Sequence, residues 1–341
     1  MSSSPPPEHK TTTAELALHF VENRTDPTSS SPSLMSQLAH RQELITYWDI
    51  HPVSHVLEIG CGQGDTTIAL ADAVGENGTV VALDPGSPDY GSPQTLAQAQ
   101  AHILTTPLGQ RIKFHFTPPI AYLNTYTGPP FTHIVLSHCI YYFASPLDFP
   151  LLLSAILPHF TASGQKLCIA EWSLHASTLN QVPHVLTALL WSTLETKRGE
   201  ESSGNVRTVL SPQQIQAAVL TAKVDTRSQR EGVSELAFKL VKQATLPSNP
   251  GLQDPFWEFN YLLSTREKEI AALRKREEGG FVSDAEIVVV EAAYDTITSL
   301  VDSLEDGVKG VECMDYWAPE IITMEKDSDT MWQIPLAASR E

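Results

Sequence analysis

The segment 56–65 combines residue types that together can bind a small charged ligand. A short apolar run ends in three alternating glycines, Gly60, Gly62 and Gly64, and a helix-like stretch begins at once at Asp65. Glycines let the chain turn sharply and let a ligand touch the backbone. The start of a helix adds free N–H groups and a partial positive charge. An acid, Glu58, stands two residues before the first glycine, so negative charge is also placed beside the loop.

Two classes of nucleotide cofactor fit such a loop, and its spacing distinguishes them. A dinucleotide site prefers GxGxxG with the pyrophosphate at the helix start, whereas this loop reads GxGxG after an acid. It resembles motif I of the class I S-adenosylmethionine-dependent methyltransferases, whose cofactor carries an amino-acid group and a sulfonium. The resemblance implies that Glu58 lies near the methionine amine and that Gly60, Cys61, Gly62 and Gly64 line the methionine and ribose. The alternative for the glycines is a tight strand-to-helix turn that binds no ligand. The alternative for Cys61 is a small side chain that only fills space.

The next predicted strand ends in a second acid. Asp84 closes the apolar run 79–84 and is followed by Pro85 in a Pro/Gly-rich loop. A carboxylate there can accept both ribose hydroxyls, although NAD enzymes use the same device. In the methyltransferase family an acid after the third strand often binds the adenine amine. Here Thr117 stands in that region, so we expect Thr117 or a backbone group to take this role.

The segment 132–143 resembles the fourth methyltransferase motif, a strand whose end faces the transferred methyl group. We expect Ser137 to contact the cofactor and His138 to act as a general base, because histidine titrates near neutrality. The alternative for His138 is a core histidine whose ring is satisfied by the protein. Three aromatic residues are candidate walls of the acceptor site or cation–π contacts to the sulfonium, or else belong to the core or a lid: Tyr141, Tyr142 and Trp172.

Apolar runs that alternate with helical patterns must position these residues. The predicted parallel strands are 54–60, 79–84, 111–116, 132–140 and 165–172. The segments 223–230 and 234–243 are predicted to form an antiparallel hairpin that closes the sheet. The fold class is therefore α/β: a Rossmann-like seven-stranded sheet with an antiparallel last strand, plus added N- and C-terminal helices.

The remaining segments suggest a division of the chain. Residues 1–12 are expected to form a disordered tail, and 13–48 to form N-terminal helices that act as a lid. The cofactor-binding domain is assigned to 49–245, with a helical insertion at 173–210. The segment 250–341 is predicted to be an all-helical extension, with helices at about 254–277 and 283–306.

Charge and cysteine content exclude several classes of protein. With 22 basic and 40 acidic residues the net charge is −18, which disfavours nucleic acids and anionic membranes as partners. The four cysteines include no CxxC pair, so neither a zinc site nor a disulfide framework is expected, and no metal is assigned. The polar first residues lack the apolar core of a secretory signal, and cytoplasmic localisation is the default.

The resemblance implies S-adenosylmethionine as cofactor and methyl transfer to an oxygen or nitrogen of a small organic molecule. The layout is similar to that of fungal secondary-metabolite methyltransferases. One alternative remains open, a protein that binds the cofactor but acts as a non-methylating enzyme, such as a cyclase, or as a subunit of a complex. Methylation of protein or RNA is disfavoured by the charge and by Ser137–Ile140, which replaces the Asn/Asp-Pro-Pro-aromatic tetrad. The added helices are a possible homodimer interface.

Overall fold

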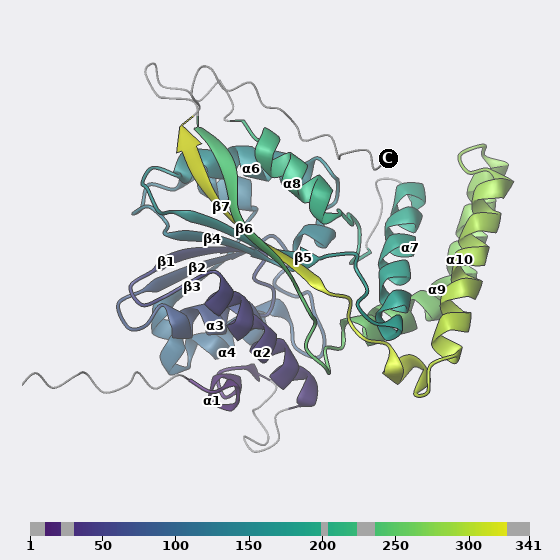
Figure 1. Cartoon of the computed structure of the whole chain (residues 1–341), viewed down its shortest axis with the longest axis horizontal. Coiled ribbons are helices and arrows are strands. Elements are labelled where there is room, and N and C mark those ends of the chain that lie inside the picture. Colours follow the sequence, from purple (N-terminus) through teal and green to yellow (C-terminus); the bar gives the residue numbers. More distant parts are fainter. Residues whose placement is uncertain (1–10, 22–30, 199–203, 224–235, 326–341) are drawn as a thin grey trace, which may run out of the picture.

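A seven-stranded mixed sheet forms the centre of the molecule (Figure 1). The computed structural model describes residues 11–21, 31–198, 204–223 and 236–325. Within these residues the strand order is β3-β2-β1-β4-β5-β7-β6. The strands are β1 (His55–Ile59), β2 (Thr79–Asp84), β3 (Ile112–Phe116), β4 (His133–Ser137), β5 (Lys166–Trp172), β6 (Leu236–Leu246) and β7 (Tyr316–Glu325). The first five are parallel and β7 is antiparallel to both of its neighbours, which confirms the predicted α/β class.

Helices cover both faces of the sheet. One face packs against α1 (Thr13–Ala17), α2 (Pro32–Tyr47), α3 (Asp65–Ala73) and α4 (Leu96–Leu104). The other packs against α5 (Pro119–Thr125), α6 (Asp148–Ile156) and α8 (Pro212–Thr221). Because both faces are buried, the inner strands read as continuous apolar runs and not as alternating ones.

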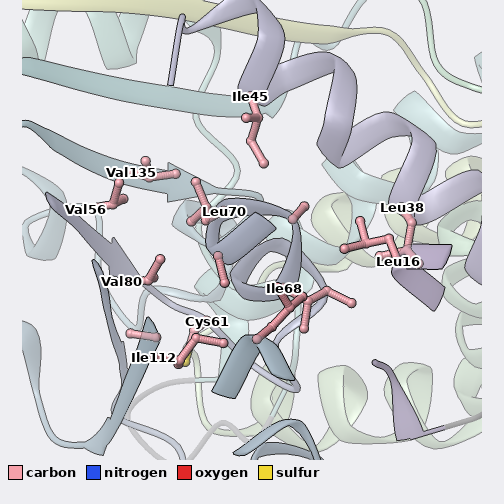
Figure 2. Packing of buried hydrophobic residues seen from close by; sticks show 14 of the residues in the cluster. Leu16, Leu38, Ile45, Val56, Cys61, Ile68, Leu70, Val80, Ile112 and Val135 are labelled. Atoms are coloured by element: carbon pink, nitrogen blue, oxygen red, sulfur yellow. The ribbon is translucent and has the colours of Figure 1, made fainter. Parts of the chain in front are cut away.

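The first core extends from the sheet to the N-terminal helices. Figure 2 shows Leu16 of α1 and Leu38 of α2 in the same cluster as Val56 of β1 and Ile68 of α3. All four side chains are fully buried. The segment predicted as a lid therefore contributes α2 to the helical layer of the main core.

A separate helical cluster lies beyond the end of the sheet. It consists of α7 (Val182–Arg198), α9 (Asp254–Glu278) and α10 (Asp284–Asp302) (Figure 1). Tyr294 and Leu262 are fully buried within it. The three helices form their own apolar core, which continues to Trp172 and Tyr316 at the sheet.

The prediction that 250–341 is all helical is wrong for 316–325. This segment is β7, which lies between β5 and β6, so α9 and α10 are an insertion between two strands of the sheet. Pro319 interrupts the apolar run, and a proline in a strand argues against a central position. The structure tolerates it beside an irregularity in β6, where the register shifts between Leu240 and Lys242.

The predicted hairpin falls within the described residues only in its second segment. Its second segment is β6, but β6 pairs with β7 from the other end of the chain, at Leu246↔Tyr316 and Phe238↔Thr323. The first segment, 223–230, lies almost entirely outside the described residues. A hydrophobicity pattern identifies a strand but not its neighbour, so the pairing of β6 with β7 was not predicted from the sequence.

Two smaller features complete the fold. The helix expected at 13–24 ends at Ala17, and α5 was not predicted, since its start carries the dipeptide Pro118-Pro119. The four cysteines are free and buried. No helix in the described ranges combines the length and apolar character that a membrane span requires.

The position of β7 leads to a stability prediction. Ile321 is 1% exposed and pairs with both Leu167 of β5 and Leu240 of β6. Ile321→Ala should lower the free energy of unfolding by about 2–5 kcal/mol, because it leaves a cavity in the core. Urea denaturation measures this, with Val241→Ala as the control, since Val241 is 45% exposed. A loss equal to that of the control would show that β7 is not part of the cooperative core.

Candidate functional site

The glycine loop joins the end of β1 to the start of α3, and its three glycines have different roles. All three adopt positive φ angles: +78° at Gly60, +53° at Gly62 and +96° at Gly64. A Cβ on Gly60 would lie 2.5 Å from Cβ of Cys139, and one on Gly64 would lie 2.6 Å from Cδ1 of Ile103. Gly60 is thus required by packing as well as by conformation, whereas at Gly64 the contact is with the end of a side chain and the positive φ is the stronger constraint.

Gly62 is the glycine that leaves room for a ligand. A Cβ built there meets no heavy atom of the described chain within 4 Å. Its carbonyl accepts a hydrogen bond from Nε2 of Gln100 at 2.8 Å, which fixes the orientation of the peptide. The backbone at Gly62 therefore forms an open cradle.

Asp84 holds this cradle in place. Oδ2 of Asp84 accepts the N–H of Gly62 at 2.7 Å, and Oδ1 accepts the N–H of Gly86 at 2.7 Å. Gly60 and Cys61 in turn donate their N–H groups to the carbonyl of Leu83, at 2.8 and 3.0 Å. Each carboxylate oxygen has a further lone pair, so Asp84 can still accept two hydroxyl groups. The side chain is partly exposed, so a ligand can reach it.

Glu58 is a buried acid on β1, two residues before the first glycine of the loop. It is 1% exposed, and Oε2 accepts a hydrogen bond from the hydroxyl of Thr67 at 2.6 Å. Burial raises the pKa of Glu58 to about 8, and the nearby carboxylates of Asp65 and Asp84 act in the same direction. The group is therefore largely protonated at pH 7, and a cation bound beside it would favour its ionised form.

One cation from α2 balances part of this negative charge. Nε of Arg41 donates to Oδ2 of Asp65 at 2.8 Å. Although burial opposes it, the charge of Asp65 and the hydrogen bond to it raise the pKa of Arg41, so the guanidinium stays charged. It lies close enough to Glu58 to oppose the rise of that pKa.

The end of β4 places Ser137 and His138 beside the loop, because β4 pairs with β1 at Leu136↔Ile59. The hydroxyl of Ser137 and Nδ1 of His138 are buried, and neither has a partner in the described chain. His138 has a φ of +52°, which is rare for a residue with a side chain. Burial lowers the pKa of His138 well below 6.5, with smaller effects of Arg41 and His40. The imidazole is therefore neutral at physiological pH.

The turn after His138 is held by a buried acid. Glu171 of β5 accepts the N–H groups of Ile140 and Trp172, both at 2.9 Å, and burial raises its pKa to about 7.

Tyr141 and Trp172 stack with 4.1 Å between ring centroids and are 7% and 3% exposed. Of the three predicted aromatic residues, only Tyr142, at 49%, is open to an acceptor.

The other predicted residues differ in what they offer a ligand. The N–H, the carbonyl and the thiol of Cys61 each have a protein partner. Pro85 is exposed beside Asp84. Thr117 is partly exposed and is tied to the same strand end, since its N–H donates to the carbonyl of Asp84 at 2.9 Å.

Two groups of residues at the site were not predicted from the sequence. His40 bonds to His138, and Arg41 bonds to Asp65, yet α2 was interpreted only by its apolar face. A signal was present, because His40 shares a helical face with Leu44 and Trp48. The first turns of α9 also add Asp254 and Glu258, whose pKa values are raised by burial.

These residues fit the chemistry of S-adenosylmethionine. The open cradle at Gly62 accommodates a ligand against the backbone, Asp84 can accept the two ribose hydroxyls, and Glu58 suits a primary ammonium group. A pyrophosphate would instead meet the carboxyl groups of Glu58, Asp65 and Asp84, with Arg41 as the cation that α2 contributes. The set of acids therefore favours a cationic cofactor.

Comparison with known sequences gives the same class. Residues 15–90, which contain the glycine loop and Asp84, match the family model of protein-L-isoaspartate(D-aspartate) O-methyltransferase. Methyltransferase phomM of Diaporthe leptostromiformis is 26% identical over 218 residues, which cover 56% of this chain and 54% of that protein. A demethylmenaquinone methyltransferase of Bacillus cereus is 42% identical over 64 residues, or 19% of this chain and 27% of that protein. The chain thus spans about half the length of phomM and less of the bacterial protein.

The fold also matches a solved structure. A cyclopropane-fatty-acyl-phospholipid synthase-like protein from Lactobacillus casei superposes with a TM-score of 0.68 at 24% identity, covering 91% of this chain and 98% of that one. This likeness concerns the fold alone. The chain is therefore related in sequence to methyltransferases and has the fold of the class I S-adenosylmethionine-dependent members.

The buried acid gives a prediction on stability. Because the pKa of Glu58 is about 8 in the folded protein and ordinarily 4.5, its contribution to stability is complete below pH 4.5 and is lost as the pH rises through 8. Glu58→Gln cannot titrate. The free energy of unfolding of the wild type, relative to this variant, should fall by at least about 1.4 kcal/mol between pH 5 and 8.5, the equivalent of one pKa unit.

Urea denaturation at several pH values measures this difference. Asp89→Asn, an exposed acid in the loop after β2, serves as the control and should show no such trend. A difference that is constant with pH would mean that Glu58 has an ordinary pKa.

Proposed function

We propose that this protein binds S-adenosylmethionine at the glycine loop and transfers its methyl group to an oxygen or nitrogen atom of a small organic molecule. The observation that carries the proposal is the bond between Asp84 and the N–H of Gly62, which holds an open backbone cradle above the buried Glu58. In this arrangement Asp84 can accept hydrogen bonds from a ribose, and Glu58 can pair with an ammonium group. Gly62 leaves room for the cofactor to approach the backbone.

Each of these residues has a defined task in the proposal. Glu58 would receive the amine of the methionine moiety, Asp84 the ribose hydroxyls, and Gly62 the body of the cofactor. Pro85 and Thr117 flank Asp84 at the edge where the adenosine part would extend, and Ser137 offers a free hydroxyl at the neighbouring strand end. When bound, the cofactor supplies a methyl group that is activated by a sulfonium. The protein mainly needs to align it with the acceptor.

His138 is the proposed general base. It is neutral, it follows β4 beside the loop, and Nδ1 has no partner in the described chain. A neutral imidazole can take the proton that an O–H or N–H acceptor loses when it is methylated. Tyr142, which is exposed, is the proposed aromatic contact of the acceptor, while Tyr141 and Trp172 support the turn from inside.

Three further observations support a small, uncharged or cationic acceptor in this proposal. The net charge of −18 repels nucleic acids and anionic membranes. Asp254 and Glu258 add acids on the side of α9, and both raise the pKa of Tyr142. The name of the Bacillus cereus relative also indicates a small-molecule substrate for that protein. Cytoplasmic localisation and a role in secondary metabolism remain part of the proposal.

Calorimetric titration tests cofactor binding directly. The protein should bind S-adenosylmethionine and S-adenosylhomocysteine but not NAD(P)H. Asp84→Ala should weaken binding of S-adenosylhomocysteine by on the order of 1.5–3 kcal/mol, because it removes a charged acceptor of two hydroxyls. Asp89→Ala, in the same loop, should leave the affinity unchanged. Binding of NADH alone, or an Asp84→Ala affinity equal to that of the wild type, would refute the assigned site.

The proposal also predicts that binding releases a proton. Glu58 is largely protonated in the free protein at pH 7, and an ammonium group beside it stabilises the carboxylate. Titrations in buffers of different ionisation enthalpy should show release of up to one proton per cofactor bound, and Glu58→Gln should show none. If the wild type and Glu58→Gln release the same number of protons per cofactor bound, Glu58 does not contact the amine of the cofactor.

A further inference from the structure

His138 is hydrogen-bonded to a second histidine from a distant part of the chain. Nε2 of His138 lies 2.9 Å from Nε2 of His40, which comes from α2. His40 is 1% exposed and His138 is 8% exposed, so the bond is shielded from solvent. This pair joins the N-terminal helical layer to the strand end at the proposed reaction site.

The geometry of the pair restricts its protonation. A neutral imidazole carries one proton, and a bond between two Nε2 atoms requires that one ring donates and the other accepts. The two rings therefore have opposite tautomers. The ring that donates through Nε2 has an unprotonated Nδ1, and the ring that accepts at Nε2 carries its proton on Nδ1. Neither Nδ1 atom has a hydrogen-bond partner in the described chain.

Packing holds both rings in place. The ring of Tyr316, on β7, lies against both, at centroid distances of 4.2 Å to His40 and 4.4 Å to His138. The N–H of His138 donates to the carbonyl of Ala170 at 2.8 Å, which fixes its backbone at the positive φ. Three elements far apart in sequence, α2, β4 and β7, thus set the orientation of one imidazole.

The charges around the pair keep both rings neutral. The guanidinium of Arg41, on the same helix as His40, lowers the pKa of both histidines in addition to burial. The remaining titratable group in contact is the phenol of Tyr316, whose pKa is raised by burial, so it carries no charge at neutral pH. No carboxylate bonds to either ring in the described residues, and the single proton between the rings is retained.

We propose that His40 is the positioning residue for His138: the Nε2–Nε2 hydrogen bond fixes the ring and leaves the buried Nδ1 as the ring nitrogen without a protein partner, the atom that would take the proton once an acceptor is bound against it. An acceptor that presents an O–H or N–H selects the state in which His138 donates to His40 and offers a bare Nδ1. The proton of the acceptor then passes to this Nδ1 while its oxygen or nitrogen forms the bond to the methyl carbon. This role rests on the proposed function.

The first test reads the tautomers and needs no turnover. Nitrogen-15 NMR of histidine-labelled protein with S-adenosylhomocysteine compares the wild type, His40→Gln and His40→Phe. The side-chain amide introduced by His40→Gln can replace Nε2 as a hydrogen-bond partner, whereas the phenyl ring of His40→Phe cannot. In the wild type the two rings should have opposite tautomers between pH 6 and 8. In His40→Phe, His138 should populate both tautomers without a hydrogen bond at Nε2, whereas in His40→Gln the amide, which can donate or accept, should keep that hydrogen bond.

The matched control is His133→Gln, a buried histidine at the opposite end of β4, which should leave the His138 signals unchanged. Identical tautomers in the wild type, or a single unchanged His138 tautomer in His40→Phe, would overturn the proposal. Calorimetry with S-adenosylhomocysteine separately tests the proposed function. Its failure is therefore distinguishable from a failure of the histidine pair.

The second test uses kinetics with an acceptor identified by screening. His40→Phe should lower kcat by about tenfold or more, a part of what general base catalysis contributes, and should change KM for S-adenosylmethionine less than about twofold. His40→Gln should recover most of the kcat. Equal losses in both variants, with a raised KM for the cofactor, would indicate that His40 only supports packing.

Discussion

The site depends on one hydrogen-bonded carboxylate. Asp84 ends β2 and accepts N–H groups from the loop after β1 and from its own loop, so it couples the two strand ends that a cofactor must bridge. Parallel strands bring their carboxyl ends to one edge, where ligands bind in open α/β sheets. Asp84 thus fixes the backbone of Gly62 and also offers carboxylate oxygens that can accept hydrogen bonds from a ligand bound beside it.

Electrostatics around this edge follow from burial more than from surface charge. Glu58 and Glu171 are almost completely buried, and the pKa values of both are raised because water is excluded. They differ in their partners: Glu171 accepts two backbone N–H groups, whereas Glu58 accepts the hydroxyl of Thr67. Glu171 is therefore committed to the turn, and Glu58 is the acid that gains most from a cationic ligand.

The topology explains how distant segments reach the site. Because β7 lies between β5 and β6, Tyr316 pairs with Trp172 at the end of β5 and its ring reaches His138 after β4. Helix α2 packs on the sheet through its apolar face, which carries His40 inward with Leu44. The helices α9 and α10 lie between β6 and β7 in the sequence, so the chain joins them to the sheet at both ends.

The sequence by itself determined the features that depend on local chemistry. Alternating apolar runs and helical patterns predicted the five parallel strands, and the spacing of Glu58, the glycines and Asp84 predicted a methyltransferase-like loop, because each is encoded within a few neighbouring residues. It also placed His138 at a strand end, but as a single histidine.

Only the tertiary structure decided which segments lie together. It separated Gly62, with open space above it, from Gly60 and Gly64, which are packed against Cys139 and Ile103. It paired β6 with β7, and it joined His40 to His138 across 98 positions of the sequence. The physical reason is that strand pairing and side-chain contacts of this kind depend on how the elements pack, and a hydrophobicity pattern specifies that a face is buried without specifying the residue that covers it.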